Sequence, residues 1–172
     1  MMKPLKRNLF SLIGIFLLIL LDQYTKHLAI LHLKGQPSFV LLDRILEFSY
    51  LENTGAAFSS FSGKQTFLIV LTTLVIIVLA WRYFTLPAGK RFLWIRTCLL
   101  FILSGAVGNL IDRLCRRYVV DFIYFVPINF PKFNVADIYI TVGVAVLAAL
   151  MLFYYNEEEC GTLVSIDSFL RK

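Results

Sequence analysis

Four long apolar stretches constrain the fold of this chain more than any other feature of its sequence. They cover about residues 9–30, 66–84, 93–111 and 135–155 of the 172 residues. A helix needs ~20 mostly apolar residues to cross the hydrocarbon layer of a bilayer, and each stretch is about that long. Because 59% of the residues are hydrophobic and only 16% are charged, a water-soluble fold could not hide so much apolar surface. We therefore predict an all-α membrane protein with four transmembrane helices.

Two longer segments separate these helices on one side of the membrane, at about residues 31–65 and 112–134. In the first, the turn signal Gln36-Pro37-Ser38 precedes a strand-like stretch at residues 45–51, and a second turn, Asn53-Thr54-Gly55, follows it. In the second, residues 118–125 form an apolar, aromatic run. We expect a small extracytoplasmic β-sheet, or cradle, from these segments, and a single membrane-embedded domain over residues 1–172.

The distribution of lysine and arginine sets the expected orientation. Basic residues are dense at the amino terminus, between the second and third helices and at the tail, and such residues favour the cytoplasmic side. The amino-terminal run resembles the front of a signal peptide, but it is too long and lacks a small-residue cleavage site, so we interpret it as a retained first helix. The prediction is a multi-pass cell-membrane protein with both termini in the cytoplasm.

Composition argues against several functions. The net charge of +6 comes largely from residues that flank the apolar stretches, so we expect no nucleic-acid partner. His27 and His32 are the only histidines, no HExxH sequence occurs, and the three cysteines show no CxxC spacing. We therefore predict neither a metal site nor a cofactor.

Charged and amide side chains near the helix ends are the candidates for function, because polar groups at membrane depth are costly. Asp22 and Lys26 stand four residues apart and can pair on one helix face. Gly105, Asn109, Asp112 and Arg113 lie on one stripe of the third helix, where glycines allow close packing. A local ion pair and a tightly packed helix that ends in polar residues are the structural alternatives.

Two further aspartates suggest chemistry. Asp121 lies inside an apolar run, where burial would raise the pKa of its carboxyl group; the alternative is a solvated charge on an edge strand. Asp137 follows Asn134 at the start of the fourth helix, where helix capping is a good alternative. Two carboxyl groups at one desolvated site share a proton, so that one activates water while the other polarises a carbonyl.

Two other classes of function fit some of these residues. Intramembrane acids such as Asp22, Asp112 and Asp137 could line a proton or cation path in a transporter, although no broken helix or repeated half is visible. A non-catalytic assembly factor could use the same polar groups only to hold helices together. Neither alternative would cleave a peptide.

Five stretches, taken in order, resemble the lipoprotein signal peptidase (type II signal peptidase) family. They are Asp22-Gln23-Tyr24-Thr25-Lys26, Asn53-Thr54-Gly55-Ala56-Ala57-Phe58, Gly105-Ala106-Val107-Gly108-Asn109-Leu110-Ile111-Asp112-Arg113, Val119-Val120-Asp121-Phe122 and Phe133-Asn134-Val135-Ala136-Asp137. Each is weak alone, but together they cover most of the chain between Asp22 and about Val146. Ser104 and the bulky pair Ile138-Tyr139 depart slightly from the family pattern, and the tail beyond Tyr155 matches no motif.

The resemblance implies a four-helix membrane aspartic endopeptidase. Such enzymes remove the signal peptide from diacylglyceryl-modified prolipoproteins, cutting just before the lipidated cysteine, and are inhibited by globomycin. It implies a catalytic pair, Asp121 and Asp137, at the extracytoplasmic face. It also implies substrate-binding or supporting roles for Asp22, Asn53, Asn109, Arg113 and Asn134, with Asp112 supporting the Arg113 end. The expected partners are lipid-modified prolipoproteins and membrane lipids.

Overall fold

The computed structural model describes residues 4–55, 64–87 and 89–164, and most of them are helical. Within these residues, four helices are long and apolar enough to cross a membrane, as the apolar stretches predict. They are α1 (Pro4–Leu33), α2 (Gln65–Thr85), α3 (Leu93–Arg116) and α4 (Val135–Phe153). The predicted fold class is thus confirmed, and the chain is a multi-pass membrane protein.

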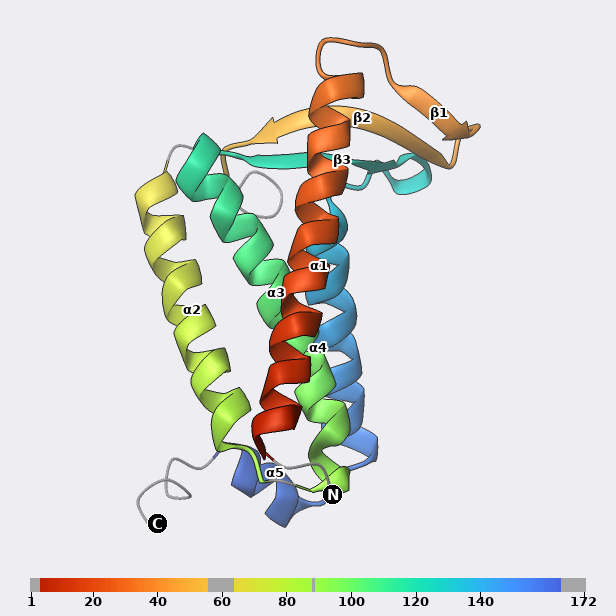
Figure 1. The fold of residues 1–172 in the computed structure, drawn as a ribbon. Coiled ribbons are helices and arrows are strands. Elements are labelled where there is room, and N and C mark those ends of the chain that lie inside the picture. The colour runs from red at the N-terminus through yellow and green to blue at the C-terminus, as the bar shows by residue number, and fades with distance from the viewer. Residues whose placement is uncertain (1–3, 56–63, 88, 165–172) are drawn as a thin grey trace.

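A small antiparallel sheet lies across one end of the helix bundle (Figure 1). Its strands, β1 (Phe39–Leu42), β2 (Leu46–Asn53) and β3 (Val119–Phe125), follow one another in the order β1-β2-β3. Asn53 pairs with Val119 across β2 and β3, and Leu51 pairs with Asp121. The sheet therefore brings the end of β2, in the first outer segment, beside the start of β3, in the second.

Helix α3 is the central helix of the bundle. In its most apolar window 61% of the residues are buried, against 6% in α1, 11% in α2 and 17% in α4. Two glycines allow α3 and α4 to approach closely: a Cβ on Gly143 would lie 2.7 Å from Ile102 Cγ1, and one on Gly105 would collide with the backbone oxygen of Ala136. Small residues at such contacts are typical of membrane helices. The close approach places the start of α4 against the polar end of α3.

Three details differ from the expectations. The third helix continues to Arg116 rather than ending near residue 111, so Asp112 and Arg113 belong to the helix and not to the outer segment. Strand β2 extends to Asn53, which the sequence placed in a turn, and β1 was not predicted. In the tail, a short helix, α5 (Glu157–Val164), follows Asn156. Ala56, Ala57 and Phe58 of the second motif lie outside the described residues.

The two ends of the bundle differ in chemistry. The start of α1 and helix α5 lie at the end away from the sheet (Figure 1). There the buried guanidinium of Arg96 donates to the carbonyl oxygens of Tyr83, Leu86 and Pro87 at the end of α2. The sheet end instead holds a cluster of buried acids and amides, and this cluster is the candidate site.

Candidate active site beneath the sheet

A backbone bridge brings the start of α4 to strand β3. The N–H groups of Phe122 and Ile123 both donate to the carbonyl oxygen of Phe133, at 3.0 and 2.9 Å, and the Phe133 N–H donates back to Ile123. The residue after Phe133 is Asn134, the N-cap of α4. The bridge therefore places Asn134 next to Asp121, although 13 positions separate them in the sequence.

Asp121 is 1% exposed and accepts two amide hydrogen bonds. Its Oδ1 accepts from Asn134 Nδ2 at 2.7 Å, and its Oδ2 accepts from Asn53 Nδ2 at 2.8 Å. Burial, together with the negative charge of Asp137, raises the pKa of Asp121 to about 7, against the lowering effect of the two amides. The carboxyl group can thus hold or release a proton near neutral pH. This pKa is the raised value that the sequence led us to expect.

Asp137 lies in the first turn of α4, within a capping box. Asn134 Oδ1 accepts from the Asp137 N–H at 3.0 Å, and Asp137 Oδ2 accepts from the Asn134 N–H at 3.1 Å. Capping, which the sequence offered as an alternative to function, is therefore real. It does not occupy the whole carboxylate, because Oδ1 of Asp137 accepts from Asn109 Nδ2 at 2.8 Å. Asn134 thus contacts both aspartates.

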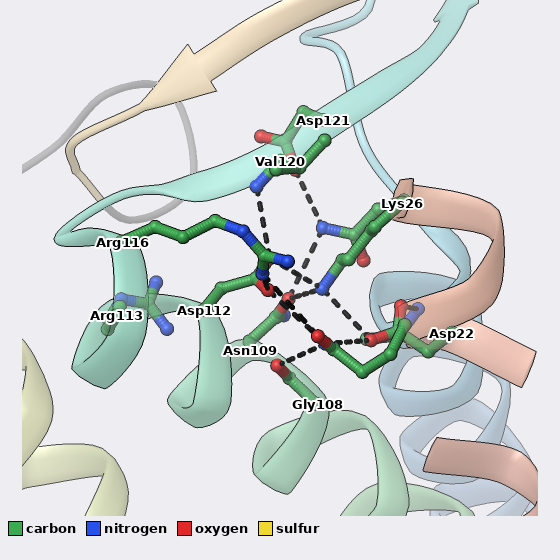
Figure 2. A network of polar contacts seen from close by, with 12 residues as sticks. Asp22, Lys26, Gly108, Asn109, Asp112, Arg113, Arg116, Val120 and Asp121 are labelled. Atoms are coloured by element: carbon green, nitrogen blue, oxygen red, sulfur yellow. Dashed lines mark hydrogen bonds and ion pairs between the residues drawn. The ribbon is translucent and has the colours of Figure 1, made fainter. Parts of the chain in front are cut away.

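A buried ionic cluster from α1 and α3 lies beside these amides (Figure 2). The Lys26 ammonium is fully buried and contacts Asp22 Oδ2 at 3.0 Å, Asp112 Oδ2 at 3.1 Å and Asn109 Oδ1 at 2.9 Å. Asp22 also accepts from the Ala136 N–H at 3.0 Å, and Gln23 donates to Asp112 Oδ1 at 3.2 Å. The cluster joins the first, third and fourth helices at the level of the site.

Arg113 and Asn53 border the site towards Gly55 in the first outer segment. One guanidinium nitrogen of Arg113 donates to the Gly55 carbonyl oxygen at 3.3 Å, and Asn53 Oδ1 accepts from the Gly55 N–H at 2.9 Å. Arg113 Nε is buried, and no acceptor for it lies among the described residues. The guanidinium of Arg113 interacts electrostatically with the carboxyl groups of both Asp121 and Asp137. A cation therefore borders the two acids.

All eight sequence-predicted site residues gather in this region. The oxygens of Asp112, at the Arg113 end of α3, accept from the Val120 N–H at 3.1 Å and pair with Lys26 and Arg116. Lys26, noted only as a partner of Asp22, lies at the centre of the cluster and also contacts α3. For Lys26 the available signal was a lysine inside an apolar stretch, and for Arg116 it was the spacing of four from Asp112. No such signal marked Gln23.

The arrangement provides two carboxyl groups, four amide or backbone N–H donors that bind them, and a nearby guanidinium. Within the ranges that the structure describes, no group of three or more His, Cys, Asp or Glu side chains is placed to hold a metal ion. A buried acid that titrates near pH 7 beside a second carboxylate is suited to general acid–base chemistry on a polar bond.

Known proteins resemble this chain over most of its length. Residues 14–153 match the model of a family described as signal peptidase (SPase) II. A lipoprotein signal peptidase of Clostridium tetani is 42% identical over 151 residues, covering 86% of this chain and 94% of that protein. One from Streptococcus pyogenes is 38% identical and covers 91% of this chain and 99% of its own.

Solved structures agree. Two structures described as a bacterial membrane enzyme studied by the in meso method each superpose with a TM-score of 0.74 at 30% identity. The first covers 83% of this chain and 87% of the solved chain, and the second covers 85% and 94%. The similarity thus includes the helix bundle and the level of the site.

Proposed function

Because the chain belongs to the signal peptidase II family, we propose that Asp121 and Asp137 are the catalytic pair with which it cleaves its substrates. As a member of the family it is a protease that removes signal peptides from prolipoproteins. The aspartic mechanism rests on one observation above all. A nearly unexposed carboxyl group with a pKa of about 7 shares Asn134 with a second carboxylate.

The proposed reaction needs only these two acids and water. The ionised carboxylate takes a proton from water while the water oxygen attacks the scissile carbonyl carbon. The protonated carboxyl group gives its proton to the carbonyl oxygen. When the carbon–nitrogen bond breaks, the leaving amine takes a proton from the first carboxyl group, and the second recovers its own from the diol. The amides around both acids hold their oxygens in place throughout.

We further propose that the substrate carries a diacylglyceryl group and is cut just before the lipidated cysteine. Such a substrate already lies in the bilayer, and the site lies where the bundle meets the sheet, which would place it near the membrane surface where the lipidated cysteine lies. The site would then face the outside of a bacterial cytoplasmic membrane, with both chain termini inside, as the basic residues favour. Globomycin-type inhibitors should block the site by occupying the same acids.

Cleavage of a lipidated prolipoprotein by the purified protein in detergent tests the proposal. Asp121→Asn and Asp137→Asn should each lower kcat by at least ~10²-fold, because each removes an acid–base group. Asp43→Asn is a matched control, since that carboxylate is 87% exposed at the β1–β2 turn. Near-normal turnover by either folded site variant would refute its assignment. A transporter or assembly factor would leave the substrate intact in every case.

A further inference from the structure

The orientation of the Asn109 amide is fixed from both ends. An ammonium group can only donate hydrogen bonds, so the Asn109 atom that lies 2.9 Å from Lys26 Nζ must be the carbonyl oxygen. The amide nitrogen therefore turns the other way and donates to Asp137 Oδ1. Asp22 and Asp112 contact the same ammonium and hold it in position. Lys26, together with Asn134 Nδ2, which also donates to Asn109 Oδ1, thus fixes which Asn109 atom Asp137 meets.

The Asn134 amide is fixed in the same way by the backbone. The Asp137 N–H can only donate, so it must face Asn134 Oδ1, and Asn134 Nδ2 must turn towards Asp121 Oδ1 and Asn109 Oδ1. As a result, each of the four carboxylate oxygens of Asp121 and Asp137 accepts one N–H. The amides favour negative charge on both acids, so they do not by themselves decide which acid holds the shared proton.

The surroundings of the two acids do differ. Asp137 is half-buried at the positive end of a helix dipole, where an anion is stabilised. Asp121 is on a strand without such a dipole and is almost fully buried. The charged groups around Asp137 are Asp121 on β3, Arg113 on α3 and, beyond Asn109, Lys26 on α1 with its partners Asp22 and Asp112. The cations lie near both acids, so what distinguishes Asp137 from Asp121 is its lesser burial and its place at the start of a helix.

We propose that Lys26 is a positioning residue that acts through Asn109 to keep Asp137 as the water-activating carboxylate, which leaves the proton on Asp121. This inference rests on the catalytic pair of the proposed function. Asp137 then takes the proton from water, and Asp121 protonates the scissile carbonyl oxygen. Lys26 is fully buried and, in this role, acts on Asp137 only through Asn109.

Asn109→Asp is the sharpest test, because it keeps the side-chain shape and an oxygen towards Lys26 and Asn134. It replaces the donor that faces Asp137 with a second oxygen and adds a carboxyl group beside that acid. The measurement is kcat for cleavage of a lipidated prolipoprotein across pH 4–9. We expect the acidic limb of the profile to move to higher pH by about one unit, since the carboxylate form of Asp137 loses a hydrogen bond and gains a like charge beside it. A limb that stays in place would overturn the proposal.

A second variant separates positioning from general charge. Lys26→Met should move the same limb in the same direction, but it should cause no further movement in an Asn109→Ala background, because the effect passes through Asn109. Arg116→Met is the matched control, since Arg116 pairs with Asp112 but has no contact with Asn109. If Arg116→Met moves the acidic limb as far as Lys26→Met does, the shift comes from the loss of a positive charge alone, and the positioning role of Lys26 is refuted.

The two proposals fail in distinguishable ways. If the unmodified protein does not cleave the substrate, or if Asp137→Asn retains normal turnover, the catalytic pair is wrong. If cleavage requires both acids but Asn109→Asp leaves the limb unmoved, only the role of Lys26 is wrong. Should Lys26→Met fail to fold, Asn109→Asp still decides, because it retains the ion pairs of Lys26.

Discussion

Asp22 on α1 accepts a hydrogen bond from the backbone N–H of Ala136 on α4, with 3.0 Å between Oδ1 and N. The first turn of a helix leaves N–H groups without partners inside that helix. Here a side chain from the first membrane helix satisfies one of them in the fourth. Asp22 therefore links the ion pair with Lys26 to the helix that carries Asp137.

Gly108 makes room for this link. A Cβ on Gly108 would lie 2.5 Å from Asp22 Oδ2, so Gly108→Ala must push the carboxylate away from Lys26 and Ala136. Breaking a buried ion pair costs about 3–5 kcal/mol, and we expect a loss of that order in the free energy of unfolding in mixed micelles. Gly14→Ala is the control, because its nearest neighbour, Leu100 Cδ1, would be at an ordinary 3.6 Å. Equal stability of the two variants would contradict the prediction.

Among the described residues, Asn134 caps α4 and Asn156 caps α5, and Asn134 is the one that contacts the site. Asn134→Ala should remove a cap worth about 1 kcal/mol, leave Asp121 Oδ1 without its donor and lower kcat. Asn156 Oδ1 accepts from the Glu159 N–H at 2.8 Å at the start of α5. Asn156→Ala should therefore cost about 1 kcal/mol or less and leave cleavage unchanged. Unfolding and cleavage assays on the two variants check these expectations. Equal losses of kcat in Asn134→Ala and Asn156→Ala would contradict the placement of Asn134 in the site.

The raised pKa of Asp121 predicts how stability changes with pH. Below about pH 4 the carboxyl group is protonated in both the folded and the unfolded chain. Between the ordinary value of 3.8 and the folded value of about 7 only the folded chain keeps the proton. In that interval stability should fall as pH rises, by up to about 1.4 kcal/mol per unit, and then level off above pH 7. Thermal unfolding at several pH values gives the slope of the free energy of unfolding against pH for the wild type and for Asp121→Asn. The difference between the two slopes isolates the contribution of Asp121, and a difference of zero would contradict the prediction.

The sequence predicted the helices well because hydropathy over ~20 residues reports directly on membrane spans. The acids were found for a similar reason, since a carboxylate within an apolar run is conspicuous. The pairing of Asp22 with Lys26 also followed from a spacing of four. Each of these is a local property of the chain.

Other features depend on contacts between distant segments. Strand β1 was missed because its four apolar residues become a strand only by pairing with β2. The partners of Asp112 were not predicted: Arg113 points to Gly55, while Arg116, one turn on, and Lys26 of α1 reach Asp112. Lys26 was left out of the site because its contact with Asn109 joins residues 83 positions apart. No spacing rule predicts which helices meet.

Two ion pairs of the polar cluster form within a single helix, and this affects how the chain can insert into the membrane. Asp22 with Lys26 and Asp112 with Arg116 are both separated by four positions. Each helix can therefore neutralise its own acid while it leaves the translocation machinery, before any other helix has arrived. The contact between Lys26 and Asp112 forms only after both helices are in the bilayer. Membrane insertion of this chain thus does not have to wait for assembly of the site.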